Sequence, residues 1–75
     1  MITYQYDKLM GARIRELRES AGMTQEQLSA KLQTLGCDIT RSALAKIEVG
    51  QRHLYSFEIK VFREALSTTY DKLFP

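Results

Sequence analysis

The 75-residue chain has one cysteine and no long apolar run. Because Cys37 is alone, no internal disulfide can form, and we expect its side chain to be a small, semi-buried apolar group in a reducing compartment, with a regulatory thiol as the alternative. No apolar stretch approaches the roughly 20 residues that cross a bilayer, and the N-terminus lacks the basic-then-apolar order of a signal peptide. These absences predict a protein that stays in the cytoplasm.

The residues that build active sites are also scarce. His53 is the one histidine, and neither a second histidine nor a cysteine cluster accompanies it, so the sequence predicts no metal site. We find no paired carboxylates, no glycine-rich phosphate loop, and no cysteine or serine with a plausible histidine base. A chain this short also buries only about 60% of its unfolded surface, which leaves no room for a large substrate cavity. We therefore expect neither an enzyme nor a cofactor or small-molecule ligand.

The charge balance is mildly basic. Eleven lysines and arginines face nine acidic residues, which gives a formal net charge of +2. This balance allows an acidic partner without requiring one, so the distribution of the charges matters more than their sum.

Apolar residues recur at helical spacing in five segments, and no alternating run is long enough for a sheet. The expected helices are Asp7 to Glu19, Gln25 to Leu35, Arg41 to Val49, a fourth from about Ser56 that contains Ile59, Phe62 and Leu66, and a last turn capped by Thr69. We expect Asp7 to cap the first helix and Gly22 to end it, with residues 1–6 loosely held. The sequence predicts one all-α domain over residues 1–75.

Two of these helices are short, and both have a threonine at the start. Thr24 has Gln27 three positions later, which is the pattern of a capping box, and Thr40 can cap the following helix in the same way. Gly50 suits the left-handed position that ends a helix. The second of the two helices opens with Arg41, a layout typical of a helix-turn-helix that reads DNA.

Several motifs place these elements in a known pattern. They are Gly11-Ala-Arg-Ile14, Leu17-Arg18, Gly22-Met-Thr-Gln25, Leu28-Ser29, Leu44, Ile47-Glu-Val-Gly50, Leu66 and Tyr70-Asp-Lys-Leu-Phe74. With them, the chain resembles the Cro/repressor-like helix-turn-helix family, also called the XRE family, over about residues 8–74. The resemblance implies a compact five-helix bundle of the lambda-repressor-like type, in which residues 24–50 form the motif and its second helix enters the major groove of double-stranded DNA.

The resemblance also implies roles for individual residues. Contacts to base edges fall to Arg41, Ser42, Ala45 and Lys46. Contacts to the DNA backbone fall to Gln25, Thr40, Gln51, Arg52 and His53. The alternative is that Gln25 is an ordinary polar residue and that the basic helix start is solvated surface, although a positive charge there is disfavoured by the helix dipole.

Two further positions bear on the geometry of the motif. Arg18 and Glu48 match a buried ion pair that ties the first helix to the end of the recognition helix in the family, whereas the alternative is two separate exposed charges. Ser29 stands where the family usually has alanine, and we expect its hydroxyl to bond back to the carbonyls of its own helix. The connection from Leu32 to Thr40 is longer than is typical, so it either lengthens the second helix or re-aims the third.

The expected function is that of a repressor-like, sequence-specific transcriptional regulator that is associated with the nucleoid when bound to DNA. We expect a homodimer, because a small domain gains specificity from two half-sites. The candidate dimer contacts are Tyr4, Tyr6, Tyr70 and Phe74, unless these aromatic residues close the core instead. The rival function is a protein-interaction module, such as an antitoxin or antirepressor component.

Overall fold

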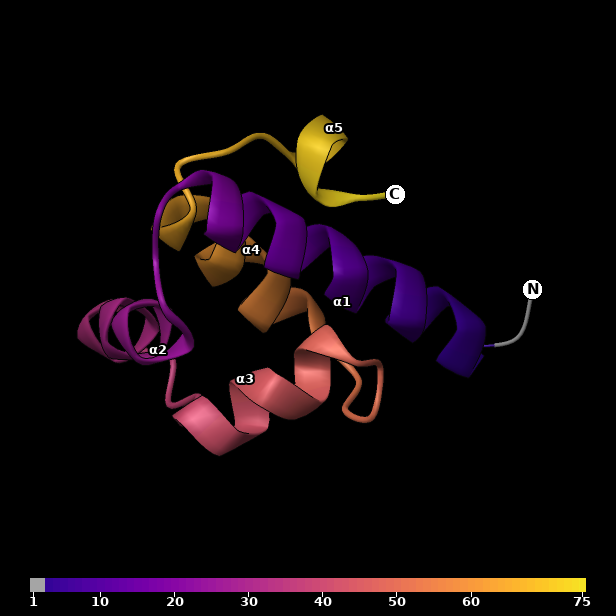
Figure 1. The fold of residues 1–75 in the computed structure, drawn as a ribbon, viewed down its shortest axis with the longest axis horizontal. Coiled ribbons are helices and arrows are strands. Elements are labelled where there is room, and N and C mark those ends of the chain that lie inside the picture. Colours follow the sequence, from indigo (N-terminus) through magenta and orange to yellow (C-terminus); the bar gives the residue numbers. More distant parts are fainter. Residues whose placement is uncertain (1–2) are drawn as a thin grey trace.

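Five helices make up the computed structural model, which describes residues 3–75. They are α1 (Thr3–Ser20), α2 (Gln25–Thr34), α3 (Arg41–Glu48), α4 (Ser56–Ala65) and α5 (Tyr70–Leu73) (Figure 1). Within these residues there is no strand. The predicted all-α, five-helix architecture is therefore confirmed.

The start of α1 departs from the expectation. Residues 3–6, expected to be loosely held, form the first turn of α1, while Met1 and Ile2 lie outside the described residues. Asp7 is consequently not a helix cap: it lies inside α1, and its Oδ1 is 2.8 Å from Nδ1 of His53 in the loop after α3. No glycine or proline occurs in residues 3–6, so nothing local stops the helix from extending towards the N-terminus.

The other helix ends follow the predicted signals. The hydroxyl of Thr24 accepts from the amide of Gln27 at 3.1 Å, and the side chain of Gln27 accepts from the amide of Thr24 at 2.9 Å, which completes the capping box. The hydroxyls of Thr40 and Thr69 also accept from the third amides of α3 and α5, without the reciprocal side-chain bond. At the end of α3, Gly50 has a φ of +79°, and the next amide, of Gln51, donates to the carbonyl of Lys46 at 2.8 Å.

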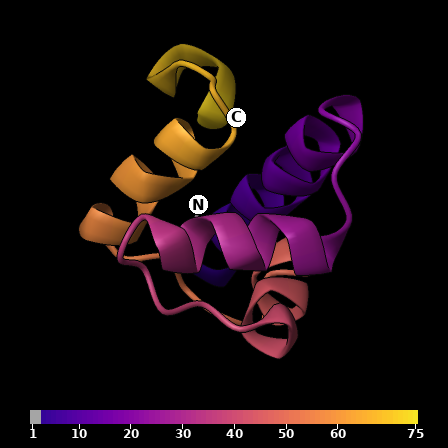
Figure 2. The same cartoon turned by 90° about the vertical axis from the view of Figure 1, so that its left-hand side faces the viewer.

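The apolar faces of all five helices meet in one core. Its fully buried members include Ile14, Leu28, Leu44, Phe62 and Leu73, one from each helix. α1 packs against α3 and α5, and α2 packs against α3 and α4. As a result α3 and α5 lie at opposite edges of the molecule, an order that both views show (Figures 1 and 2). One side of α3 is therefore left facing solvent.

α1 and α3 approach each other most closely at Gly11. A Cβ atom added there would lie 2.0 Å from the carbonyl oxygen of Ile47 and 2.9 Å from the backbone of Glu48. Both obstacles are backbone atoms of α3, which cannot move aside as the end of a flexible side chain can. A residue without a side chain is thus required for α3 to sit at this depth against α1.

We expect Gly11→Ala to lower the free energy of unfolding by about 1–3 kcal/mol, the usual cost of forcing an extra carbon into a packed site, even though alanine is the better helix former. Ala12→Leu is the matched control, because Ala12 is the next residue of α1 and is exposed. Its stability should stay within about 0.5 kcal/mol of the wild type. Urea denaturation followed by circular dichroism measures both variants, and a Gly11→Ala protein as stable as the wild type would show that the helices are farther apart.

Candidate nucleic-acid interface

One face of α3 is exposed along its whole length. Arg41 and Ser42 at its first turn are exposed, Lys46 one turn later is exposed, and Ala45 beside them is half-buried. The opposite face, which carries Leu44, lies in the core. The structure thus brings the four predicted base-contacting residues onto one accessible surface.

The two charges of this face have no partner among residues 3–75. In the part of the chain that the structure describes, neither Arg41 nor Lys46 forms a salt bridge or a side-chain hydrogen bond. Arg41 also sits at the N-terminal end of α3, where the helix dipole disfavours a cation. An anion bound at this face would offset that cost, so the arrangement favours a negatively charged partner.

The N-terminus of α2 lies beside this face. Arg18, Thr24, Gln25, Glu26 and Arg41 line a shallow recess between α2 and α3. The first amides of a helix have no partner within the helix and point out of its end, so they can hold a phosphate oxygen. An anion held at the start of α2 would lie next to Arg41 of α3.

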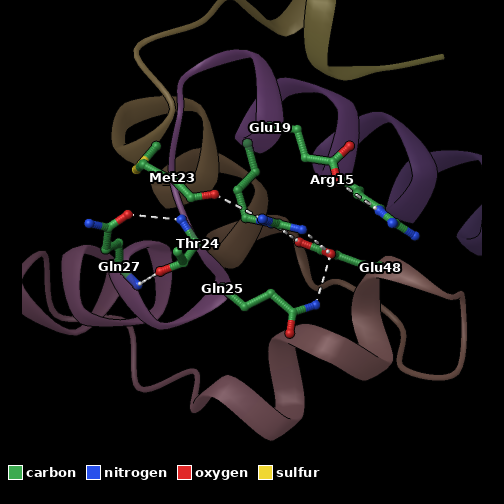
Figure 3. Close-up of polar contacts among 8 residues, drawn as sticks. Arg15, Glu19, Met23, Thr24, Gln25, Gln27 and Glu48 are labelled. Atoms are coloured by element: carbon green, nitrogen blue, oxygen red, sulfur yellow. Dashed lines mark hydrogen bonds and ion pairs between the residues drawn. The ribbon is translucent and has the colours of Figure 1, made fainter.

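Gln25 contributes to this recess and also to the interior. Its Nε2 donates to Oε1 of Glu48 at 3.0 Å, and the residue is half-buried (Figure 3). One N–H of the side-chain amide is therefore used inside the protein, and the second is left for another acceptor. The sequence placed Gln25 correctly at the first position of α2 but gave no sign of its contact with Glu48, 23 residues away.

Arg18 and Glu48 meet in a buried, bidentate pair beneath the recess. Arg18 Nε lies 2.7 Å from Glu48 Oε2, and Arg18 Nη2 lies 3.0 Å from Oε1, with the two side chains only 9% and 2% exposed (Figure 3). The third nitrogen of the guanidinium donates to the carbonyl of Met23 at 2.8 Å. The hydrogen bond from Arg18 to Glu48 raises the pKa of Arg18 above its ordinary value, although burial opposes the rise. α1, the turn before α2 and the end of α3 are thereby joined at one point.

In the loop after α3, Arg52 has a partner within the protein. Arg52 Nη1 and Nη2 donate to the two carboxylate oxygens of Glu58 at 3.0 and 2.9 Å, so its guanidinium is engaged within the protein. Glu58 is the third residue of α4, and its Oε1 also accepts from the amide of Tyr55 at 3.1 Å. The arginine therefore holds the start of α4 in place, which the sequence did not indicate.

The residues on either side of Arg52 are more exposed to solvent than Arg52 is. Gln51 and His53 both lie on the surface, on either side of Arg52. His53 is tied to Asp7 of α1 through Nδ1, and its ring packs edge-on against Tyr55, with centroids 5.5 Å apart. Gln51 and His53 are thus the more exposed of the three loop residues that the sequence assigned to the DNA backbone.

The structure shows where part of the extra length between α2 and α3 lies. α2 runs two residues beyond Leu32, to Thr34, and Gly36 with a φ of +87° ends it, so part of the extra length extends the helix. The expectation for Ser29 is wrong: its Oγ donates to the carbonyl of Ile39, at 2.6 Å, rather than to its own helix. The two helices pass so closely here that the nearest acceptor belongs to the turn before α3.

Other classes of site receive no support from the described residues. None of their His, Cys, Asp and Glu side chains gather in groups of three that could hold a metal ion. Among residues 3–75, no helix combines the length and the apolar character that spanning a membrane requires. Cys37 is buried, and burial raises the pKa of its thiol.

We expect Arg18→Ala and Glu48→Ala each to lower the free energy of unfolding by about 3–5 kcal/mol, because either change leaves an uncompensated buried charge. Arg15→Ala is the control, since Arg15 pairs with Glu19 on the surface of the same helix and such pairs contribute about 0–1 kcal/mol. The double variant Arg18→Met/Glu48→Leu should recover much of the loss. Denaturant titrations measure all four proteins, and single-variant losses no larger than that of Arg15→Ala would contradict a structural role for the pair.

The Arg52 and Glu58 pair predicts a pH-dependent contribution to stability. The hydrogen bonds from Arg52 lower the pKa of Glu58 below its ordinary value of 4.5. The contribution is therefore fully present above pH 4.5 and is lost as the pH falls through the lowered pKa. We expect Glu58→Gln to cost about 1 kcal/mol at pH 7, and this difference from the wild type to shrink below pH 4.5.

Thermal melts at several pH values test this expectation. The control is Glu64→Gln, which changes an exposed residue of the same helix that should alter stability little at any pH. A Glu58→Gln penalty that stays constant down to pH 3 would assign its effect to packing, not to charge.

Comparison with known proteins agrees with this arrangement. The helix-turn-helix family profile matches residues 14–73. Among solved structures, the restriction-modification controller protein C.AhdI from Aeromonas hydrophila is 32% identical in sequence and superposes with a TM-score of 0.82, over 95% of this chain and 96% of that one. Among curated proteins, none matches the sequence significantly. The chain belongs to the XRE family of helix-turn-helix proteins and is a DNA-binding transcriptional regulator.

Proposed function

We propose that the protein is a sequence-specific, repressor-like regulator that places α3 in the major groove of its operator and works in the cytoplasm without a cofactor. The observation that carries the proposal is the contrast between the two sides of α3. Its inner side is fixed by Gly11 and by the buried Arg18 and Glu48 pair, while its outer side presents Arg41 and Lys46, which have no partners among the residues that the structure describes. A helix that is held rigidly and exposes unpaired cations suits recognition of DNA.

Each exposed residue of α3 has a distinct proposed role. Arg41 donates two hydrogen bonds to O6 and N7 of a guanine, the pairing that a planar guanidinium fits best. Ser42 and Lys46 add polar contacts to neighbouring base edges, and Ala45 offers a small apolar surface to a thymine methyl group. These four side chains determine the sequence that is read.

The DNA backbone is held on both sides of α3. On one side, the amides at the start of α2 and the free N–H of Gln25 bind a phosphate, with Thr40 close by at the start of α3. On the other side, Gln51 and His53 of the exposed loop contact phosphates that lie either further along the same DNA strand or on the opposite strand. Arg52, which is half-buried and paired with Glu58, lies between them and is the third proposed contact of this loop.

We further propose that the regulator is a homodimer. Tyr4, Tyr6, Tyr70 and Phe74 are all exposed, at 57%, 37%, 44% and 37%, so they do not close the core. α5 is held against α1 by Arg13, whose Nη1 donates to the carbonyl of Lys72 at 2.6 Å, and it lies at the edge away from α3 (Figure 1). Contacts through these aromatic residues would leave both recognition helices free for two half-sites.

Selection of bound fragments from random DNA tests the proposal directly. A sequence-specific reader enriches a common motif, and a dimer enriches an inverted repeat of it with half-sites about one helical turn apart. Mobility shifts of the enriched fragment at two salt concentrations should then show a steep loss of affinity through counterion release. If no motif is enriched, the protein-interaction module, as in an antitoxin or antirepressor component, becomes the better account.

We expect Arg41→Ala to weaken binding to the selected sequence by about 1–3 kcal/mol, the range for one bidentate base contact, while binding to random DNA falls much less. Arg15→Ala is the matched control, because it also removes one exposed positive charge but from the surface of α1. Fluorescence anisotropy with both DNA types measures the affinities. Equal losses on the two DNA types would make Arg41 a phosphate contact.

A further inference from the structure

We propose that Ser29 is a positioning residue for DNA reading: through its hydroxyl it fixes the place where α3 begins and thus the direction of the base-contacting side chains. This inference rests on the proposed function above. Ser29 lies in α2 and is not itself one of the proposed DNA contacts. Ser29 is 5% exposed and lies in the core side of α2.

The hydrogen bond made by Ser29 spans the two helices of the motif. Its Oγ donates to the carbonyl oxygen of Ile39 at 2.6 Å, and Ile39 is fully buried. Ile39 directly precedes Thr40, the residue that caps α3, and Arg41 follows the cap. The bond therefore acts on the backbone two residues before the side chain proposed to read a guanine.

The bond matters for the position of the beginning of α3, because the end of the helix is fixed by other contacts. At the end of the helix, Gly11 allows a close backbone contact and Glu48 accepts hydrogen bonds from two side chains. At the beginning, residues 35–40 form a connection without regular structure. The other side chain that reaches the Ile39 carbonyl is Gln33, whose Nε2 is 3.5 Å away, at the limit of a hydrogen bond.

Removing the hydroxyl would leave a buried carbonyl with a weak donor. A buried acceptor that loses its partner is costly, so the backbone at Ile39 is expected to shift towards Gln33 or towards water. A small shift there turns the first residues of α3, and the long side chain of Arg41 magnifies it. Bidentate base contacts tolerate little misalignment, whereas phosphate contacts made by point charges tolerate more.

The same reasoning accounts for two departures from the family pattern together. The resemblance predicts alanine at position 29 and a shorter connection before the cap of α3, and this chain has serine and a longer one. A longer connection restrains the start of the next helix less, because more backbone angles are free to vary. The serine hydroxyl supplies a specific restraint at the last buried residue of that connection.

The test compares Ser29→Ala with Thr34→Ala. Ser29→Ala deletes one oxygen and keeps the helix propensity, so the protein is expected to fold. Thr34→Ala is the matched control: its Oγ1 also donates to a backbone carbonyl, that of Ala30 at 2.9 Å, but within α2 and on the exposed side. For each protein we would measure the Kd for the selected DNA, the Kd for random DNA, and the denaturation midpoint.

We expect Ser29→Ala to reduce the ratio of specific to non-specific affinity about tenfold, at temperatures where it is fully folded, because the Arg41 contact is misaligned. Non-specific affinity should stay within about twofold, since the phosphate contacts persist. Thr34→Ala should change neither quantity. If Ser29→Ala lowers both affinities equally, or lowers stability alone, Ser29 has a packing role and the proposal is wrong.

A measurement on the free protein separates this inference from the proposed function. Amide hydrogen exchange and amide chemical shifts of residues 40–43 report the start of α3 without DNA. We expect them to change in Ser29→Ala and not in Thr34→Ala, while residues 46–48 change little. Unchanged signals at residues 40–43 would overturn the positioning role, whereas a wild-type protein that selects no DNA motif would overturn the proposed function alone.

Discussion

The buried contact between Arg18 and Glu48 is the constraint on which the rest of the structure depends. Two opposite charges that are almost fully removed from water must satisfy each other, and Glu48 takes a further hydrogen bond from Gln25. The third nitrogen of the Arg18 guanidinium donates to the Met23 carbonyl. The pair thereby sets the angle between α1, the start of α2 and the end of α3, and it can do so only if α1 lies as close to α3 as Gly11 permits.

The parts of the fold that the sequence predicted are those with local causes. The threonine caps and the glycines after α1, α2 and α3 act within one turn of the chain, so the starts of α2 and α3 and the ends of α1 to α3 fall within a residue of the expected positions. The true start of α1 was missed because the partner of Asp7 is His53, 46 residues away. The Arg18 and Glu48 pair could be predicted because the family resemblance, not the local sequence, identified the distant partner.

In the candidate site, too, the features with local causes could be predicted from the sequence, and those that depend on tertiary contacts could not. Four residues of α3 share an exposed face because helical spacing dictates it, and the sequence alone suffices to place Arg41, Ser42, Ala45 and Lys46 together. The use of the other charged residues depends on tertiary contacts. Arg52 reads as a free surface cation in the sequence, but the start of α4 brings Glu58 within 3.0 Å of it, and the Ile39 carbonyl comes within reach of Ser29 only when α2 and α3 are packed.

The distribution of cations explains how a net charge of only +2 suffices for an acidic partner. Arginines 18 and 52 are neutralised by buried or half-buried carboxylates and hold the scaffold, whereas Arg41 and Lys46, on the outer face of α3, have no partner within the described part of the chain. A domain of this size has about 5–15 kcal/mol of stability, so it cannot reorganise much on binding without losing its fold. Holding the recognition helix in place beforehand removes part of the entropy cost of association. On the proposal that the cations of α3 contact DNA, they do so in a geometry that already exists, so we expect a change in the scaffold contacts to alter which sequence is read before it alters how strongly DNA is attracted.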